Sequence, residues 1–560
     1  MSSSQTLYNG IELPEPWPPR WDRLALDPPA PPYLVSPPKV IPIDVGRQLF
    51  VDDFLIEQTT LSRTMHTAEY HASNPVLEPD KPWEDEGVFI PVSSGRPMVG
   101  PFACPFSDGV WYDPDDKLFK MWYMAGRLFA TCYASSQDGI HWEKPELDVV
   151  PGTNIVHPGN RDTSVVWLDL NATDPQRRYV LYRFEKKPRR GFALHYSADG
   201  IHWSDEILRA GECLDRATVF YNPFRGVWVH SLKAIGPVSG YDESIPKSTQ
   251  GYGDAERIVR YWEQEDLVDS PMWTRSDEPY LWVHTDRRDP VYPGTDCGQP
   301  KIYDLDAVAY ESLIIGAFAI LETYYPGVEE DRPKRNQIQM GFSRDGFHWD
   351  RPLRKPLAPV SDTRGDWNWG NMQPAGGVCL VVGDELHFYF SGRAGCGRTY
   401  PEPITGPDAI SARDCDASTG IAVLRRDGFA SMDGGAGGGT LTTRPVLFSG
   451  KYLFVNVDCL DGELQVEVLD LDGKVIEPFT REGCEHVSVD KTLQSVSWSG
   501  IDDLSSLAGQ PVHFRFSLTQ GRLYSFWVSP QASGASHGYV AAGGPGFTGH
   551  TDTVGMAAER

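Results

Sequence analysis

Acidic and amide residues recur at matching places in this chain, just ahead of short strand-like runs. Asp162 lies five residues before Trp167, and Asp215 lies five residues before Phe220. Two amides stand at similar places ahead of later runs, Gln299 and Gln373. Carboxylates transfer protons and amides bind hydroxyl groups, so these residue types gathered at one place suit a polyhydroxylated ligand. The spacing predicts one shared site, provided that the fold brings these runs together.

A repeated phrase predicts the elements that would position these residues. Ser-x-Asp-Gly-x-His-Trp occurs at 136–142, 197–203 and 343–349. Asp-Gly is a strong hairpin signal, because the central positions of such turns need a positive φ. A degraded copy lies at 426–429, and the run 257–262 followed by Trp273 fills the long gap between the second and third copies. Repetition at this scale, with three or four short strands in each unit, predicts the five blades of a β-propeller.

The predicted fold class is all-β, a five-bladed β-propeller followed by a C-terminal β-sandwich. An extended proline-rich arm covers residues 1–45, and the propeller covers 46–432. A Gly-rich linker follows, and alternating strands over 440–530 predict the sandwich. The Gly/Ala-rich tail at 531–560 is expected to be poorly ordered.

Charge and composition limit the partners and the compartment. The chain has 560 residues and a net charge of −26, which argues against nucleic acid or an anionic membrane as a partner. No apolar stretch reaches the roughly 18 residues that a membrane span needs, and the N-terminus has no basic segment followed by an apolar one. The nine cysteines are scattered singly, which is typical of free thiols in a reducing compartment. We therefore expect a cytoplasmic protein, and the sequence gives no oligomeric state.

Two short segments carry a family resemblance. The segment Asn160-Arg161-Asp162-Thr163 resembles the Arg-Asp-Pro segment of glycoside hydrolase family 32, with Thr163 in place of the proline. The segment 211–215, Gly-Glu-Cys-Leu-Asp, resembles the Glu-Cys segment of that family and lies in the next predicted blade. The Asp-Gly hairpins look like those of families 32, 43 and 130. A five-bladed propeller followed by a sandwich is the layout of family 32.

The resemblance implies roles for the acids. Glycoside hydrolysis requires two carboxyl groups that flank one bond, often helped by a third. By the resemblance, Asp162 is the transition-state stabiliser and Glu212 the general acid/base, whereas the alignment of the blades favours Asp215 as the acid. Family 32 carries its nucleophile in an Asn-Asp-Pro-Asn segment that this chain lacks. Three aspartates are candidates for that role, Asp108, Asp52 and Asp53.

Other residues are candidates for binding the substrate. Arginines would hold an anionic group, amides would hold hydroxyls, and tryptophans would stack on a sugar ring. The candidates are Arg161, Arg216, Gln299, Gln373, Trp83 and Trp369. We predict no cofactor and no metal, because the repeated His141, His202 and His348 belong to separate blades and cannot meet at one ion.

These features predict a glycoside hydrolase that binds an oligosaccharide or another glycoside and cleaves a furanoside. A fructofuranoside or an arabinofuranoside is the expected substrate, cleaved with retention of configuration. One alternative is a phosphorylase or transglycosylase on the same propeller, which would show a basic anion site or a dry acceptor subsite. The other is a carbohydrate-binding propeller without catalysis, because one fold serves many functions.

Overall fold

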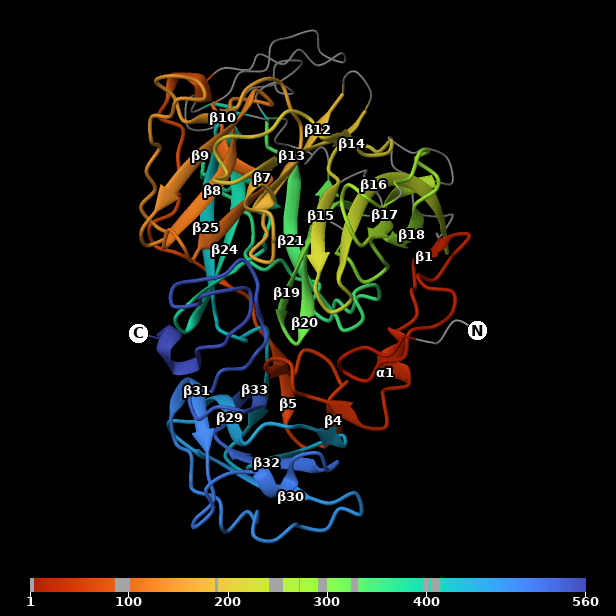
Figure 1. Cartoon of the computed structure of the whole chain (residues 1–560), viewed down its shortest axis with the longest axis vertical. Helices are drawn as coiled ribbons and strands as arrows, with labels where there is room; N and C mark the ends of the chain where they lie inside the picture. The colour runs from red at the N-terminus through yellow and green to blue at the C-terminus, as the bar shows by residue number, and fades with distance from the viewer. Residues whose placement is uncertain are drawn as a thin grey trace.

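The computed structural model describes residues 5–85, 101–186, 190–240, 255–270, 272–290, 300–323, 331–395, 402–403, 413 and 415–559. Strands dominate these residues, which confirms the all-β class. A propeller forms the upper body in Figure 1, a sandwich forms the lower body, and the N-terminal arm runs alongside both. The helices of the described residues are short: α1 (Pro32–Val35), η1 (Pro82–Glu84), η2 (Pro175–Arg177), η4 (Ser505–Leu507) and η5 (Gly555–Glu559).

The upper body contains one antiparallel sheet for each predicted blade. The first blade consists of β7 (Ala103–Asp113), β8 (Leu118–Ala125), β9 (Ala130–Ser136) and β10 (Ile155–His157). The second consists of β11 (Ser164–Leu168), β12 (Tyr179–Glu185), β13 (Gly191–Ser197) and β14 (Leu208–Arg209). The third consists of β15 (Thr218–Asn222), β16 (Val227–Ser239), β17 (Ala255–Gln264) and β18 (Tyr280–Val283).

The last two blades take strands from both ends of the chain. The fourth consists of β19 (Lys301–Glu311), β20 (Leu313–Thr323) and β21 (Arg335–Ser343). The fifth consists of β22 (Gly370–Pro374), β23 (Leu380–Val382), β24 (Glu385–Arg393) and β25 (Ala417–Arg425). Added strands are β1 (Leu24–Ala25) on β16, β6 (Glu69–Tyr70) on β25 and β34 (Tyr539–Val540) on β19. Because β6 precedes the first blade yet completes the last one, hydrogen bonds join the two ends of the ring.

Contacts between consecutive blades close the ring. The inner strand β7 packs on β11, β11 packs on β15, and β15 packs on β19. Strand β22 then contacts β21 of the fourth blade and β7 of the first. The five units predicted from the repeat therefore form a closed propeller with the five inner strands around its axis.

The repeated phrase forms the same turn in three blades. The Oδ1 atom of Asp138 accepts from the backbone N–H of His141 at 2.8 Å, and its Oδ2 pairs with the His141 ring at 2.7 Å. Asp199 and Asp345 repeat this arrangement with the histidines of their own turns. Gly139 has a φ of 77°, a conformation that favours glycine. Each histidine thus belongs to a local turn, and the described residues contain no group of three His, Cys, Asp or Glu side chains that could hold a metal.

The lower body consists of two sheets with a separate hydrophobic core. One sheet contains β31 (Asp490–Val496), β29 (Tyr452–Asp458), β33 (Gly521–Ser529), β26 (Ala430–Gly434), β5 (Ser62–Met65) and β3 (Gln48–Leu49). The other contains β30 (Glu463–Leu469), β32 (His513–Thr519), β27 (Gly439–Thr443) and β4 (Ile56–Thr59). Strand β2 (Ile41–Pro42) pairs with β28 (Val446–Leu447) beside them.

The structure corrects two boundaries of the predicted propeller. Residues 48–65, assigned to the propeller from the sequence, supply three sandwich strands, and β26 at the other boundary also joins the sandwich. The reason is side-chain burial: Phe50, Phe54 and Leu55 pack in the sandwich core. A strand joins the sheet against which its apolar face is buried, whatever its place in the chain.

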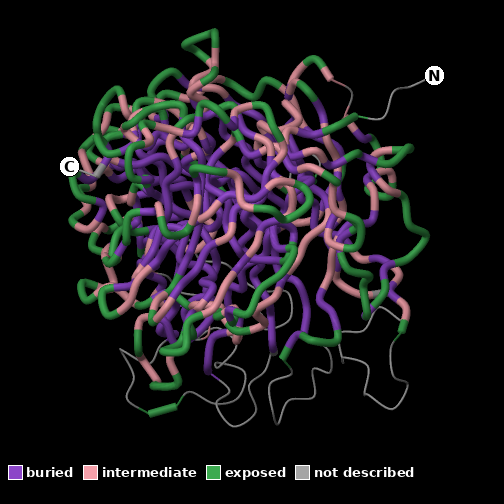
Figure 2. Tube along the Cα trace, turned by 90° about the horizontal axis from the view of Figure 1, so that it is seen from below, coloured by how far each residue is buried: buried purple, intermediate pink, exposed green. Residues whose placement is uncertain are grey.

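The C-terminal tail is ordered against the propeller, which contradicts the expectation of poor order. Ala535 and Val540 have no exposed surface, and β34 extends the sheet of the fourth blade. Figure 2 shows the buried residues filling the interior, with exposed residues at the periphery. Among the residues that the structure describes, no helix is long and apolar enough to cross a bilayer.

Candidate functional site

The upper mouth of the propeller, where the inner strands begin, brings together residues from three blades. The Nη1 atom of Arg216 donates to Thr163 Oγ1 at 3.2 Å and to Gln373 Oε1 at 3.1 Å. Its Nη2 atom lies 3.4 Å from Asp162 Oδ1. Three predicted site residues from the second, third and fifth blades, Asp162, Arg216 and Gln373, therefore meet at the axis although they are far apart in sequence.

The backbone around this mouth is irregular. Three residues other than glycine have a positive φ there, Ser107 at 65°, Arg216 at 62° and Asn371 at 50°. The register also shifts within β7, β19 and β22. Positive φ values in such residues cost energy and gather at functional sites, and bulges re-aim side chains. The irregularity therefore supports a functional role for this end of the axis.

Asp108 lies beneath the mouth in a closed ion pair with Arg161. The two Arg161 Nη atoms contact the two carboxylate oxygens at 2.6 and 3.1 Å, and the Ser164 hydroxyl donates to the same carboxylate. Asp108 has no exposed surface, and burial raises its pKa against the opposing charge of Arg161. With both carboxylate oxygens held by Arg161 and Ser164, Asp108 supports the site and lacks the free oxygen that the nucleophile predicted from the sequence would need.

Asp52 and Asp53 lie away from the axis, so both are wrong as nucleophile candidates. Asp52 is buried and binds Arg344 through two nitrogens, with the closest contacts at 2.8 Å. The side chain of Asp53 is 75% exposed and pairs with Arg63. Their segment was expected to lead into the first blade, but its apolar residues carry it into the sandwich.

The two candidate acids of the third blade differ in their surroundings. Glu212 is exposed and lines a pocket with about 690 Å³ of empty space, open to solvent, together with Lys233 and Arg260. Asp215 forms an ion pair with Lys233, and its side chain is 36% exposed. Burial raises the pKa of Asp215, but Lys233 and Arg216 outweigh this effect and hold the pKa below its usual range. Asp215 is therefore ionised at neutral pH.

Asp304, on the inner strand of the fourth blade, is a buried carboxyl group with a raised pKa. It is fully buried, and within the described part of the chain neither of its oxygens has a hydrogen-bond partner. Burial raises its pKa to about 7, although Arg216, Arg257 and Lys233 act in the opposite direction. A carboxyl group whose pKa is raised to near neutral pH is a candidate general acid.

Tyr303, the neighbour of Asp304, lies among cations. It is the extra residue of the bulge in β19, and its hydroxyl lies 3.3 Å from Lys334 Nζ. Its ring centre is 5.0 Å from the Arg257 guanidinium and 5.4 Å from that of Arg216. Burial raises the pKa of Tyr303, but Lys334, Arg216, Arg257 and Lys233 outweigh it and lower the pKa to about 7. We call these four cations the cation cluster.

The remaining predicted substrate-binding residues are two tryptophans and one glutamine. Trp369 has no exposed surface and packs between the guanidinium groups of Arg332 and Arg364, so it offers no face to a sugar. Trp83 is half-buried on η1, and its indole donates to Asn154 Oδ1 at 2.9 Å. Gln299 lies outside the described residues.

Sequence reasoning missed five residues of the mouth: Tyr303, Asp304, Lys233, Arg257 and Lys334. The available signal was the interruption of apolar strands by charged residues, most clearly Asp304 within the buried strand β19. A charge inside such a run is costly unless it is paired or functional. The blade alignment considered only residues ahead of the inner strands, which is why it passed over Asp304.

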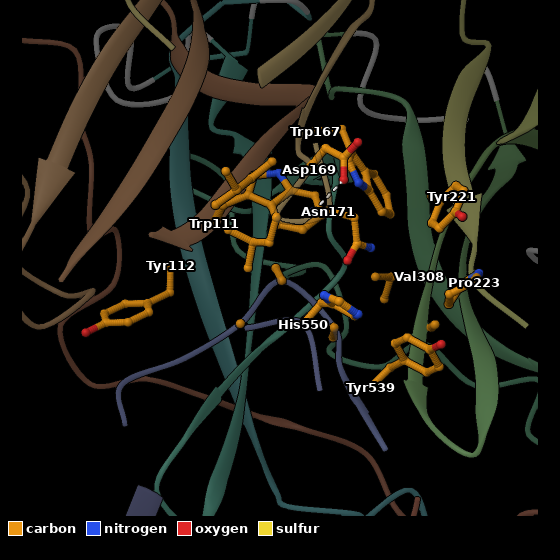
Figure 3. Close-up of a pocket in the computed structure, with 16 residues that line it drawn as sticks. Trp111, Tyr112, Trp167, Asp169, Asn171, Tyr221, Pro223, Val308, Tyr539 and His550 are labelled. Atoms are coloured by element: carbon orange, nitrogen blue, oxygen red, sulfur yellow. Dashed lines mark hydrogen bonds between the residues drawn. The ribbon is translucent and has the colours of Figure 1, made fainter. Parts of the chain in front are cut away.

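The lower mouth, at the opposite end of the axis, is a different kind of pocket (Figure 3). Aromatic residues near the ends of the inner strands, Trp111, Trp167 and Tyr221, line about 540 Å³ of empty space that is partly open to solvent. The C-terminal tail supplies Tyr539 and His550, whose rings stack with centres 5.8 Å apart. The paired acids and cations lie at the other end, so we assign the candidate active site to the upper mouth.

Comparison with known proteins found solved structures of low similarity to this chain. No family model and no curated protein matches it. An N-acetylgalactosamine deacetylase from F. plautii, in complex with blood group B trisaccharide, is 14% identical over 63% of this chain and 97% of its own (TM-score 0.39). A structure from family 130, described as mannoside phosphorylases that include glycoside hydrolases targeting β-1,2 mannosidic linkages in Candida mannan, is 13% identical over 68% and 96% (TM-score 0.40).

A third similar structure is a family 43 arabinoxylan arabinofuranohydrolase from Bacillus subtilis, in complex with cellotetraose. It is 11% identical over 83% of this chain and 99% of its own, with a TM-score of 0.34. What these proteins bind or cleave is a property of those proteins. Because their TM-scores are below 0.5, these similarities carry no argument about the fold. The propeller is assigned from the order of strands in the sheets of this chain alone.

Proposed function

We propose that this protein is a carbohydrate-active enzyme, a glycoside hydrolase whose active site is the upper mouth. The observation that carries the proposal is a pair of carboxyl groups with pKa values shifted in opposite directions, Asp304 upward and Asp215 downward. Glycosidases need one protonated and one ionised carboxyl group at the same bond. Asp162 and Gln373 contact Arg216, whose charge acts to lower the pKa of both carboxyl groups of the pair. These three side chains suit the hydroxyls of a sugar ring.

In the proposed reaction, the Asp215 carboxylate attacks the anomeric carbon and forms a glycosyl ester. The glycosidic C–O bond breaks, and the proton of Asp304 passes to the leaving oxygen. Water then loses a proton to the Asp304 carboxylate, and its oxygen bonds to the anomeric carbon as the ester breaks. Asp215 leaves as a carboxylate and Asp304 is protonated again, so the cycle closes with net retention.

Glu212 is the rival acid, because it lines the pocket next to the Asp215–Lys233 pair. The side chain of Glu212 is exposed, whereas burial raises the pKa of Asp304, so we prefer Asp304 as the acid. The proposed substrate is a fructofuranoside or an arabinofuranoside, on the strength of the Arg161-Asp162 and Glu212-Cys213 segments and their likeness to family 32.

The test is a screen of nitrophenyl furanosides, nitrophenyl pyranosides and natural oligosaccharides, with NMR assignment of the first-formed anomer. We expect furanoside cleavage with retention, lost in Asp215→Asn and reduced in Asp162→Asn. The matched control is Asp277→Asn, an exposed carboxylate that also lines the Glu212 pocket. Parent-like activity in both axial variants would overturn the assignment, and greater loss in Glu212→Gln than in Asp304→Asn would transfer the acid role to Glu212.

A further inference from the structure

We infer that the cation cluster is a subsite for an oxyanion, either an anionic group on the sugar substrate or free inorganic phosphate. The inference rests on the proposed function, because it names a second ligand group at the same mouth. It is argued from the positions of Arg216, Lys233, Arg257 and Lys334 around Tyr303.

The four cations come from separate elements and converge on one point. Arg216 precedes β15, Lys233 lies on β16, and Arg257 lies on β17, so the third blade supplies three of them. Lys334 comes from the fourth blade, directly before β21. The charged groups of Arg216, Arg257 and Lys334 lie between 5.0 and 5.5 Å from the centre of the Tyr303 ring. Lys233 is the fourth cation that lowers the pKa of Tyr303.

The four cations gather in a chain whose net charge is −26. Lys233 lies beside Asp215, and Arg216 lies beside Asp162. Arg216 also has a buried Nε–H without a hydrogen-bond partner among the described residues. Guanidinium and ammonium groups held together in a protein cleft bind carboxylate, sulfate and phosphate oxygens through charge-assisted hydrogen bonds.

The pKa of Tyr303 reflects the positive charge of the cation cluster. The cations stabilise its phenolate strongly enough to outweigh burial. A bound oxyanion would draw on the same cations and repel the phenolate, so binding would raise the pKa of Tyr303. Oxyanion binding near pH 7 is therefore expected to be coupled to proton uptake by this one phenol.

The position next to Asp304 suits both sources of the oxyanion. An anionic substituent of the sugar would be held in the cluster while Asp304 donates its proton to the leaving oxygen. Free phosphate would instead attack the anomeric carbon with one of its oxygens. The glycosidic bond would break, the leaving oxygen would take the Asp304 proton, and a glycosyl phosphate would form.

The experiment is calorimetric titration of the full chain with inorganic phosphate, sulfate and glucuronate at pH 7, in buffers of different ionisation enthalpy. We expect binding of at least one probe, weakened about tenfold or more in Lys334→Gln and Arg257→Gln. The control Arg275→Gln removes a cation whose side chain is 70% exposed and should bind as the parent does. Proton uptake should vanish in Tyr303→Phe while binding persists.

Absence of binding by all three probes, or equal binding in the parent and both cluster variants, would overturn the inference. If Arg257→Gln fails to fold, Lys334→Gln decides the outcome, because Lys334 is only half-buried. Formation of a glycosyl phosphate would identify free inorganic phosphate as the oxyanion that the cation cluster binds. A kcat/KM about tenfold or more higher for anionic glycosides than for matched neutral ones would identify an anionic group of the sugar substrate as the bound oxyanion.

Failure of this inference is distinguishable from failure of the proposed function. Titrations of Asp304→Asn measure oxyanion binding without turnover. Cleavage of neutral furanosides without any oxyanion binding would remove the subsite and leave the hydrolase. Oxyanion binding with no cleavage of any glycoside would remove the hydrolase and leave an oxyanion site at the mouth.

Discussion

Two clusters of buried charged residues in this molecule differ in how fully their carboxyl groups are hydrogen-bonded. One is the upper mouth, and the other is an interdomain network beneath the propeller, in which every side chain has no exposed surface. The interdomain network consists of Arg47, Arg426, Glu311, Asp427 and Asp552. It joins the residue before sandwich strand β3, the fourth blade, the end of the fifth blade and the C-terminal tail.

Asp427 shows how completely the carboxylates of the interdomain network are satisfied. Its Oδ1 accepts from the Tyr310 hydroxyl at 2.5 Å, and its Oδ2 accepts from Arg47 at 3.1 Å and from Ser525 at 2.6 Å. Asn456 donates to the same Oδ2 at 3.2 Å. Burial raises the pKa of Asp427, but the arginines outweigh it and lower the pKa. This aspartate belongs to the degraded fourth copy of the repeat, and it has exchanged the local turn contacts for contacts with the sandwich.

The comparison distinguishes the charged groups of the interdomain network, which stabilise the fold, from those of the upper mouth, which are candidates for catalysis. In the interdomain network each buried carboxylate has partners that compensate its desolvation. At the mouth, Asp304 has none among the described residues, so its burial is a cost to stability. A buried acid that costs stability and has a displaced pKa is the signature of a functional group.

The largest expected effect is the loss of activity in Asp304→Asn. Removal of a general acid should lower kcat/KM by about 10²–10⁴-fold on glycosides with poor leaving groups, and much less on nitrophenyl glycosides. Urea unfolding at pH 8 should give parent-like or higher stability, because an uncompensated buried charge is removed. If Asp304→Asn cleaved glycosides with poor leaving groups at the parent rate, Asp304 would not be the general acid. The functional distinction between the two clusters would then be lost.

Asp427→Asn should act in the opposite way, with a loss of about 3–5 kcal/mol in the free energy of unfolding. The kcat/KM of the folded enzyme should stay at the parent value, because the change lies far from the mouth. Asn tolerates the positive φ of this position, 60°, so the loss reports charge rather than backbone strain. The matched control is Asp138→Asn in an intact copy of the turn, whose carboxylate is half-exposed and whose loss should be smaller.

The pH dependence should have opposite signs in the two clusters. The folded-state pKa of Asp304, about 7, lies above the unfolded value of about 3.9, so stability falls as pH rises between them. Asp427 has a lowered folded-state pKa, so its contribution is lost as pH falls below the unfolded value. Urea unfolding of the parent and each Asn variant across pH 3–8 should show each slope disappear in its own variant. The parent should also lose kcat/KM above about pH 7, where Asp304 ionises.

The smallest effect is expected for Asp53→Asn. The side chain of Asp53 is 75% exposed, and its partner Arg63 is also held by the carbonyls of Phe50 and Asp52, so the free energy of unfolding should change by less than about 0.5 kcal/mol. Activity should equal that of the parent. A loss of activity in Asp53→Asn, measured beside Asp304→Asn, would restore Asp53 as a candidate nucleophile.

Local chemistry determined the part of the fold that could be predicted from the sequence. The Asp-Gly turns and the short apolar runs between them specify strands and hairpins within a few residues, so the five blades and their order were predictable. Residues 48–65 were not, because their apolar side chains are compatible with either body. Only packing against the strands of 430–529 placed them in the sandwich.

The site divides in the same way. The sequence by itself predicted that Asp162 and Asp215 lie just ahead of inner strands, because each lies five residues before a recognisable aromatic residue. Gln373 lies within its strand, β22, rather than ahead of it. Only the tertiary structure decided which carboxyl group stays protonated, since a pKa depends on burial and on charges that arrive from other blades. Asp304 and the cations around it lie on strands far apart in the chain, and their influence on one another exists only when the ring has closed.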